Sequence, residues 1–386
     1  MRFRLLNVVV ALSAAGLACA QTELPGTPTP ADAPTQLPAP TVVVATSTAE
    51  PTASNASTET ATAAVVDATA TPTADATATP ATDPASGPGS DVYFDNRSDA
   101  QSLVWSYVNA LARHEPLRAH GYWRDVPDRP VFADMEAANQ NLTSASVEIG
   151  QILADAGAGQ RYFAVPALVT METTDGNGVD VDCFYLHVSS PDLQAVPPFN
   201  PLGIERLTSR PLTESDNAAN ALATACPSDA GGPMEPLPAF DPADIGAARY
   251  LDDRSDPALL LGSMFNAINR QEYARAYGYW DATSAESRPF DDFAAGYADT
   301  RNVTLEFGTV TPDAGAGQYY FQVPLILRAE TAAGAKQVYA ACYTLHLSNP
   351  SFQATPPFEP LAIRSGTAKK ITEADAAARL QTICAP

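Results

Sequence analysis

The chain has 386 residues, of which 45% are hydrophobic and 17% charged, so part of it can bury a core, while 34 prolines indicate that another part cannot. The formal net charge of −22 argues against nucleic acid as a partner and against electrostatic docking on anionic lipid. The length suggests two or three domains.

The first twenty residues have the three parts of an export signal. Two arginines precede an apolar stretch from Leu5 to Leu17, and small residues follow it. Gly16-Leu17-Ala18-Cys19 resembles the bacterial lipobox, in which the cysteine is lipidated and becomes the first residue of the mature chain. The alternative is ordinary signal-peptidase cleavage after Ala20, which would give a secreted protein. We expect a signal peptide over residues 1–18, an extracytoplasmic location, and membrane attachment only through a lipid on Cys19.

Residues 19–90 are predicted to form a disordered tether. From Gln21 to Ser90 the chain is almost entirely Thr, Ala, Pro, Ser and Asp, and it contains no aromatic residue. Such a segment cannot bury enough apolar surface to offset the entropy lost on ordering. We expect it to hold the folded domains away from the membrane. A shorter linker is predicted over residues 228–246.

The remainder of the chain repeats itself with an offset of 157 to 159 residues. Tyr93-x-Asp95-Asn96-Arg97-Ser98-Asp99 returns as Tyr250-x-Asp252-Asp253-Arg254-Ser255-Asp256, and Asp155–Gln160 returns unchanged as Asp313–Gln318. A repeat of this length predicts two copies of one domain, at residues 91–227 and 247–386.

Each copy is predicted to begin with helices. An apolar stripe at helical spacing is present in both copies: Leu103, Val104, Tyr107, Val108 and Leu111, then Leu260, Leu261, Met264, Phe265 and Ile268. Ser98 and Ser255 are the predicted N-caps. A short second helix is expected to end at Tyr122-Trp123 or Tyr279-Trp280. A third helix is expected over Pro130–Ala138 and Pro289–Ala298.

Strand patterns follow the helices. Ser146–Ala154 and Gln160–Thr170 flank an Asp-Ala-Gly-Ala-Gly turn, which is typical of a hairpin. Further strands are predicted at Val179–Ser189 and Ile204–Arg210, and Thr213 or Ser215 then caps a final helix that carries Cys226. The predicted fold class is α+β. Each of two tandem repeats has N-terminal helices packed on a curved antiparallel sheet and a C-terminal disulfide-linked helix.

The chain contains five cysteines, an odd number for an exported protein. Repeat symmetry favours the pairs Cys183–Cys226 and Cys342–Cys384 over the other pairings, and it leaves Cys19 unpaired, as lipidation requires. A histidine lies four positions after the first cysteine of each pair, at His187 and His346. In a strand these two residues lie roughly 13 Å apart, which is too far for one zinc ion with ligand bonds of about 2 Å. We therefore expect no metal site.

Three helices followed by a curved antiparallel sheet, with a Tyr-Trp pair closing the second helix, resembles the nuclear transport factor two-like (SnoaL-like, cystatin-like cone) superfamily. Asn266-Ala267-Ile268-Asn269-Arg270-x-x-Tyr273-x-x-Ala276-Tyr277-x-Tyr279-Trp280 is especially similar to the opening of such domains. The resemblance implies a cone with a pocket between helices and sheet. It also implies roles that range from isomerases and dehydratases to catalytically silent binding or spacer modules. The terminal helix and its disulfide depart from the family pattern.

Eight side chains are candidates for lining a pocket in the cones: Tyr122, Trp123, Tyr162 and His187 in the first copy, and Tyr279, Trp280, Tyr320 and His346 in the second. His187 and His346 are the only histidines that both copies share. Either could act as a general base. The alternative is a histidine fixed by hydrogen bonds beside the disulfide, and aromatic residues that are simply part of the core.

The motifs G-x-S-x-G, H-E-x-x-H, C-x-x-C and the Walker loop do not occur, so no catalytic residue and no cofactor are predicted. Our leading hypothesis is an exported, lipid-anchored protein whose two non-catalytic domains bind a small ligand, a glycan or a protein, or serve as spacers. Two similar copies suit a bivalent binder, because tethered sites gain effective concentration. The rival hypothesis is an exported enzyme with a His/carboxylate acid–base site in the cone pocket.

Overall fold

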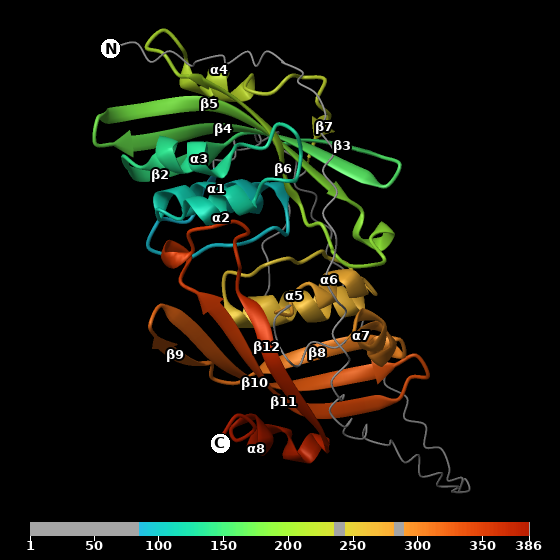
Figure 1. Ribbon diagram of the computed structural model, residues 1–386. Helices are drawn as coiled ribbons and strands as arrows, with labels where there is room; N and C mark the ends of the chain where they lie inside the picture. The colour runs from blue at the N-terminus through green and yellow to red at the C-terminus, as the bar shows by residue number, and fades with distance from the viewer. Residues whose placement is uncertain (1–84, 235–243, 282–288, 386) are drawn as a thin grey trace, which may run out of the picture. The chain divides into compact units, whose positions relative to one another are not determined.

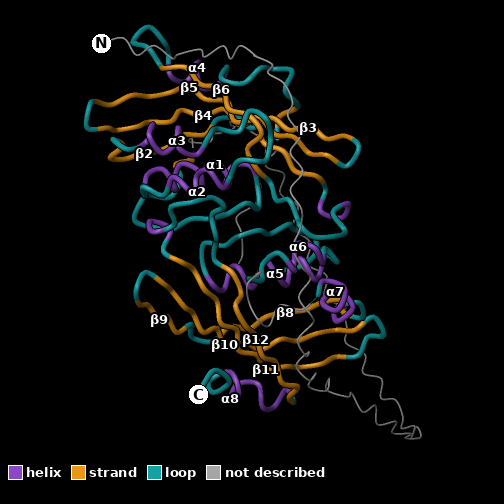
Figure 2. Tube along the Cα trace, viewed as in Figure 1, coloured by secondary structure: helices purple, strands orange, loops and turns teal. Residues whose placement is uncertain are grey.

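Two antiparallel sheets with helices packed against them make up the described part of the chain (Figures 1 and 2). The computed structural model describes residues 85–234, 244–281 and 289–385, all within one unit, Thr77–Pro386. The first sheet has seven strands and the second has five. The α+β class predicted from the sequence is therefore confirmed. The predicted signal peptide, Cys19 and most of the predicted tether lie outside the described residues.

Three helices precede the first sheet: α1 Ala100–Ala112, α2 Pro116–Gly121 and α3 Phe132–Asn139. The predicted apolar stripe of α1 is buried. The cap differs from the prediction by one residue, because the Asp99 carboxylate accepts from the Ser102 backbone N–H at 2.8 Å. Ser98 is instead used in a long-range contact that is described below.

The first sheet is built around a long central strand. Its main strands are β2 Leu142–Ile149, β3 Leu153–Gly157, β4 Gln160–Thr173, β5 Gly176–Ser189 and β6 Gly203–Pro211. β4 pairs with β5 along its whole length, and β5 pairs with β6. Two short strands, β1 Ala85–Ser86 and β7 Gly232–Pro233, pair with β2 and β3. They lie in segments that the sequence assigned to the tether and the linker.

The strand predicted at Ser146–Ala154 is divided into β2 and β3, which share one edge of β4. The division lies opposite Pro166, in the middle of β4. Proline has no N–H group, so it cannot donate a ladder hydrogen bond at this position. Its carbonyl still accepts from Gly150 at 2.8 Å. Pro324 and Gly308 make the same contact, also at 2.8 Å, in the second sheet.

The predicted hairpin between β3 and β4 is present. Its two turn residues, Ala158 and Gly159, have φ of 50° and 75°. Positive φ at both central positions is the signature of the type I′ turn, whose twist matches that of the flanking strands. Ala316 and Gly317 repeat these angles at 50° and 76°.

The C-terminal half has the same order of main elements. Its helices are α5 Pro257–Asn269, α6 Tyr273–Tyr277 and α7 Phe290–Tyr297, and its strands are β8 Thr300–Phe307, β9 Thr311–Gly315, β10 Gln318–Thr331, β11 Lys336–Ser348 and β12 Ala362–Ile371. Asp256, rather than the predicted Ser255, caps α5. Short 3-10 helices occur at Pro191–Leu193 (η1), Pro350–Phe352 (η2) and Glu373–Asp375 (η3).

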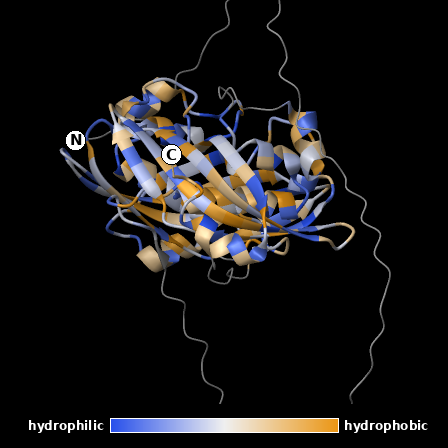
Figure 3. Ribbon diagram, turned by 90° about the horizontal axis from the view of Figure 1, so that it is seen from below, coloured by the Kyte–Doolittle hydropathy of each residue, from blue (hydrophilic) through white to orange (hydrophobic). Residues whose placement is uncertain are grey.

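The two faces of each sheet pack against different elements, as the alternation of residues along a strand requires. On β5, Phe184, Leu186 and Val188 join the main core with α1, whereas Val181 packs against Leu222 of α4 (Ala218–Ala223) on the opposite face. Figure 3 shows hydrophobic and hydrophilic residues alternating along the strands. We call the side toward α1–α3 or α5–α7 the inner face and the opposite side the outer face.

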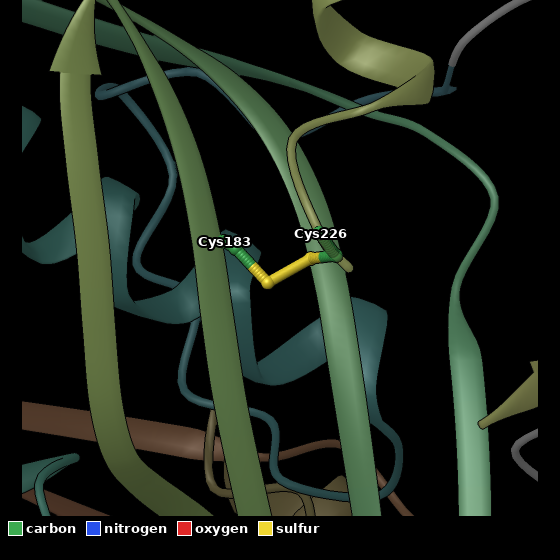
Figure 4. Close-up of a disulfide and its surroundings, with 2 residues drawn as sticks. All are labelled: Cys183 and Cys226. Carbon is green, nitrogen blue, oxygen red and sulfur yellow. A yellow bond between two sulfur atoms is a disulfide. The ribbon is translucent and has the colours of Figure 1, made fainter. Parts of the chain in front are cut away.

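Both predicted disulfides are present on the outer faces. Cys183 of β5 is bonded to Cys226, which follows α4 rather than lying in it (Figure 4). Cys342 of β11 is bonded to Cys384, which follows α8 Ala376–Leu380. The N-cap of α4 is Asn217, and not Thr213 or Ser215. Each disulfide thus ties the segment after a short terminal helix to its sheet.

Candidate functional site

Tyr122 and Tyr279, two of the eight predicted pocket residues, lie in buried polar networks. Each ring is 1% exposed. The Tyr122 hydroxyl donates to Asp95 at 2.9 Å, and the Tyr279 hydroxyl donates to Asp252 at 2.8 Å. Burial raises the pKa of both tyrosines, and the neighbouring aspartates raise it further. Both therefore act as hydrogen-bond donors near neutral pH.

Each half also contains a buried arginine–glutamate ion pair. Arg118 donates to Glu115 at 2.6 Å, and Arg275 donates to Glu272 at 2.7 Å. All four side chains are at most 3% exposed. Both arginines also donate to the side-chain oxygen of a buried asparagine, Asn109 or Asn266. Charges buried at this depth need such partners, because desolvation alone would make them costly.

Trp123 and Trp280 pair through their backbones with Ile204 and Ile363, the second residues of β6 and β12. Trp123 is 7% exposed and belongs to the main core of its half. The indole N–H groups of both tryptophans are buried, and within the described residues that of Trp280 has no hydrogen-bond partner. Trp280 packs edge-on against Tyr343, with ring centroids 6.2 Å apart.

The other four predicted pocket residues lie on the outer faces. Tyr162 and His187 are cross-strand partners on β4 and β5. Their rings are stacked at a centroid distance of 4.5 Å and an interplanar angle of 11°. Gln160 Oε1 lies 2.7 Å from His187 Nε2 and accepts from the Ser189 hydroxyl at 2.8 Å. Because an amide oxygen can only accept, the His187 Nε2 nitrogen carries the proton.

The equivalent residues of the C-terminal half make the same contacts. Tyr320 is stacked on His346 at a centroid distance of 4.7 Å. Gln318 Oε1 lies 2.6 Å from His346 Nε2 and accepts from Ser348 at 3.0 Å. Strand alternation explains the grouping, since glutamine and tyrosine are two residues apart on one strand and histidine and serine are two apart on the next.

The charged residues beside the two histidines have opposite signs at equivalent positions of the two halves. Arg124 and Asp281 occupy equivalent positions, because their N–H groups donate to the carbonyls of Ile204 and Ile363, both at 2.8 Å. The residues after these isoleucines are Glu205 and Arg364. Burial lowers the pKa of each histidine. The arginine in each half, Arg124 or Arg364, lowers it further, and the acidic residues partly oppose this. Both histidines are therefore neutral at pH 7.

Several exposed apolar side chains lie in the segments that carry these clusters. Seven large hydrophobic side chains of the described residues are exposed: Val92, Val131, Tyr162, Leu193, Val196, Tyr319 and Phe352. The last five lie at the start of β4 or β10 or in the loop after β5 or β11. Leu193 lies against Gly159, and Phe352 lies against Gly317, so both cover the equivalent turn. We call this surface the Tyr–His face. It comprises Gln160, Tyr162, His187, Ser189 and Leu193 in one half, and Gln318, Tyr320, His346, Ser348 and Phe352 in the other.

The inner faces of the two halves differ. Asp182 is 5% exposed, and no residue of the described part of the chain forms a hydrogen bond with its Oδ1 atom. Burial raises its pKa to about 6, and a hydrogen bond from Ser209 partly opposes this effect. Tyr107 lies nearby, and its pKa is also raised by burial and by Asp182. Ala341 takes the place of Asp182 in the second half. An aspartate in phase with Phe184 and Leu186 was the sequence signal for this group.

The repeated Tyr-x-Asp motifs join the two halves, which the sequence reasoning did not foresee. The backbone N–H of Arg97 donates to the backbone carbonyl of Asp252, and the backbone N–H of Arg254 donates to the backbone carbonyl of Asp95, both at 2.7 Å. Ser98 and Ser255 accept from the N–H groups of Asp252 and Asp95, both at 2.8 Å. The contacts are reciprocal, as in an interface with two-fold symmetry. The predicted helix caps are therefore junction residues.

A cavity of about 120 Å³ lies at this junction. Arg97 and Arg254 line it, one from each half, together with Tyr279. A second cavity of about 380 Å³ lies beside β2, and Trp105 and the Gly87–Gly89 segment are among the residues that line it. The Tyr–His face lines neither of these cavities.

Neither a membrane-spanning helix nor a metal cluster is found in the described residues. None of their helices is both long and apolar enough to cross a bilayer. No group of three or more His, Cys, Asp or Glu side chains is placed to hold a metal ion there. A comparison with protein-family models found no match, and a search of curated proteins found no similar sequence.

Proposed function

We propose that this chain is an exported, lipid-anchored binding protein made of two copies of one cone-like domain, and that each copy presents its Tyr–His face to a carbohydrate. The sequence repeat and the equal order of main elements support the duplication. The two disulfides support an oxidising, extracytoplasmic location, because such bonds persist there. The lipobox-like segment at Cys19 supports the anchor. Neither domain is catalytic in this proposal.

One observation carries the proposal. The Tyr–His faces keep the same four polar and aromatic side chains in the same geometry, whereas the inner faces diverge at Asp182 and Ala341. Tyr162 is 41% exposed and Phe352 is 72% exposed, so the stability of the fold does not explain why these apolar side chains lie where they do. Exposed apolar groups clustered at one place mark interaction surfaces in soluble proteins.

The chemistry of the face suits a carbohydrate. Gln160 turns its carbonyl oxygen toward two donors, so its NH₂ group is directed away from them. An amide NH₂ provides two donors, and a tyrosine hydroxyl provides one donor and an acceptor. An amphipathic tyrosine ring offers a surface for the C–H face of a sugar ring. The exposed Leu193 and Phe352 cover the turns that precede the two tyrosines. These groups match the alternation of hydroxyl and C–H groups on a sugar.

The test is titration of the full chain with soluble oligosaccharides of the gluco, xylo, manno and N-acetylglucosamino series, followed by calorimetry. We expect one of these series to bind. Tyr162→Ala and Tyr320→Ala should each abolish one of two sites. The double variant should bind no oligosaccharide. On an immobilised polysaccharide, loss of one site should weaken retention by roughly a hundredfold or more, because avidity is lost.

Val131→Ala is the matched control, since Val131 is 65% exposed but lies outside the Tyr–His face. It should leave binding unchanged. Failure of all four series to bind at millimolar concentration would overturn the carbohydrate proposal. Equal binding by the double variant would show that the face is not the site.

The rival, an enzyme with a His/carboxylate acid–base pair in the cone, has less support. Such a pair needs a hydrogen bond between its members. His187 Nδ1 is 3.9 Å from Glu205, and both histidines lie on the outer faces rather than between helices and sheet.

A further inference from the structure

Beyond the proposed carbohydrate binding, we propose that the cavity at the junction of the two halves binds a small oxyanion between Arg97 and Arg254. This site is separate from the Tyr–His face. Arg97 and Arg254 come from equivalent positions of the repeated motif and line the same cavity, together with Arg275 and the carboxylates of Asp95 and Asp252.

Each guanidinium is held in place by uncharged groups. Arg97 donates to the carbonyls of Gly121 and Leu202, at 2.9 and 3.4 Å. It lies over the ring of Tyr122, 4.6 Å from the centroid. A guanidinium has five N–H donors, so three remain.

Arg254 is held in the same way. It donates to the carbonyls of Gly278 and Leu361, both at 2.9 Å, and lies 4.5 Å from the Tyr279 centroid. Within the described residues neither Arg97 nor Arg254 forms an ion pair with a carboxylate. Two oriented cations thus face one cavity with spare donors, and arginine is the residue best suited to bidentate recognition of carboxylate and phosphate.

The acidic groups at the junction are already occupied by protein donors. Asp95 accepts from Tyr122 and Tyr93, and Asp252 accepts from Tyr279 and Tyr250. The oxygens of Asp253 accept from the Ser255 N–H and the Asn96 amide. These carboxylates therefore do not offer the donors that an anion needs, and they do not neutralise Arg97 and Arg254 by direct contact.

The charged lining of the cavity leaves a small positive surplus. Three arginines line it (Arg97, Arg254 and Arg275), against the two carboxylates of Asp95 and Asp252. This local surplus occurs in a chain whose net charge is −22.

The size of the cavity limits the ligand. About 120 Å³ corresponds to roughly four water molecules at their share of liquid volume. Phe199, Pro201 and Pro360 form the apolar part of its wall. The cavity thus suits a phosphate, a sulfate or a short dicarboxylate, and it is too small for a nucleotide or a sugar chain.

The test uses the full chain with inorganic phosphate and with malonate, and sodium chloride of equal ionic strength serves as the reference. Thermal unfolding and calorimetry report binding, because a ligand that binds only the folded state raises the unfolding midpoint in a saturable manner. We expect at least one of the two anions to raise it. Arg97→Gln and Arg254→Gln should each weaken binding at least tenfold and by similar factors, since the two arginines are equivalent.

Arg161→Gln and Arg301→Gln are the controls, because these arginines are exposed and do not line the cavity. They should bind the anion as the parent chain does. If the glutamine variants fold poorly, Arg97→Lys keeps the charge but loses the planar fork, and it should weaken binding less than Arg97→Gln. No shift beyond that of chloride with either anion would overturn the proposal, and so would an equal loss in the two controls. Neither result would bear on carbohydrate binding.

Discussion

The side-chain amide of Asn96 donates a hydrogen bond of 2.7 Å to the Asp253 carboxylate, and this bond joins the two halves of the chain. The two residues occupy equivalent places in the repeated motif, so the junction pairs an amide with a carboxylate. The pKa of Asp253 is raised from 3.8 to about 7, chiefly by burial and also by the neighbouring Asp95 and Asp252, against hydrogen bonds from Ser255 that lower it. The junction therefore holds a carboxyl group that titrates near neutral pH.

The raised pKa of Asp253 makes stability depend on pH. The folded state binds this proton more tightly than the unfolded state, so its contribution is full below about pH 4 and is lost as pH rises toward 7. Asp253→Asn should keep a hydrogen bond to Asn96 and remove this loss. We expect the variant to be more stable than the parent chain at pH 8 and close to it at pH 4, as measured by urea unfolding.

An acid in place of Asn96, the hydrogen-bond partner of Asp253, should destabilise the junction. Asn96→Asp replaces the donor by a second acid, so the two carboxyl groups repel each other once both are ionised. We expect a loss of stability that grows from pH 5 to pH 8. Asp313→Asn, on the exposed β9–β10 hairpin, is the control and should show no such trend. An unchanged pH profile in Asn96→Asp would contradict the assigned contact.

The buried ion pair of α2 should be costly to break. Arg118→Met leaves the Glu115 carboxylate buried with only Arg113 beside it, which should cost about 3–5 kcal/mol. Arg118→Met with Glu115→Leu should cost less, because the unpaired charge is then absent. Denaturant unfolding of both variants measures the difference.

A surface pair provides the comparison for Arg118. Arg301 is 70% exposed and lies 3.8 Å from Glu330, so Arg301→Met should change stability by less than about 1 kcal/mol. A loss for Arg118→Met no larger than that for Arg301→Met would contradict the buried network.

The buried acid of the first sheet should also affect stability. Burial raises the pKa of Asp182 to about 6, so the folded state favours its protonated form and stability falls as pH rises from about 4 to 6. Asp182→Asn should remove this fall and gain on the order of 2 kcal/mol above pH 7. Asp192→Asn, at an exposed site in η1, should leave the pH profile as it is.

The two disulfides should contribute almost equally. Their sequence separations are 43 and 42 residues, and loop-closure entropy predicts about 4 kcal/mol for each. Cys183→Ser with Cys226→Ser, and Cys342→Ser with Cys384→Ser, should each lower stability by a similar amount in non-reducing urea unfolding. Cys19→Ser should have no effect there. A loss confined to one of the two pairs would show that the halves differ in their dependence on the cross-link.

Local patterns in the sequence were sufficient to predict much of the fold. The helical stripe around Leu103, the Ala158-Gly159 turn and the alternation along β5 depend on residues close together in the chain. The pairing of Cys183 with Cys226 followed from the repeat. The prediction for Ser146–Ala154 was wrong in one respect, because Pro166 on the opposite strand divides that segment, and a strand partner is not visible in a local pattern.

The sequence by itself determined the order of elements, the α+β class and the two disulfides, because each depends on short-range periodicity or on a repeat within the chain. Only the tertiary structure decided how the side chains are used. It placed His187 and His346 on the outer faces, gave Ser98 and Ser255 to the junction instead of to helix caps, and brought Arg97 and Arg254 to one cavity. The histidine placement depends on pairing between neighbouring strands, and the junction depends on contacts between residues more than 150 positions apart, such as Asn96 and Asp253; no local propensity encodes these contacts.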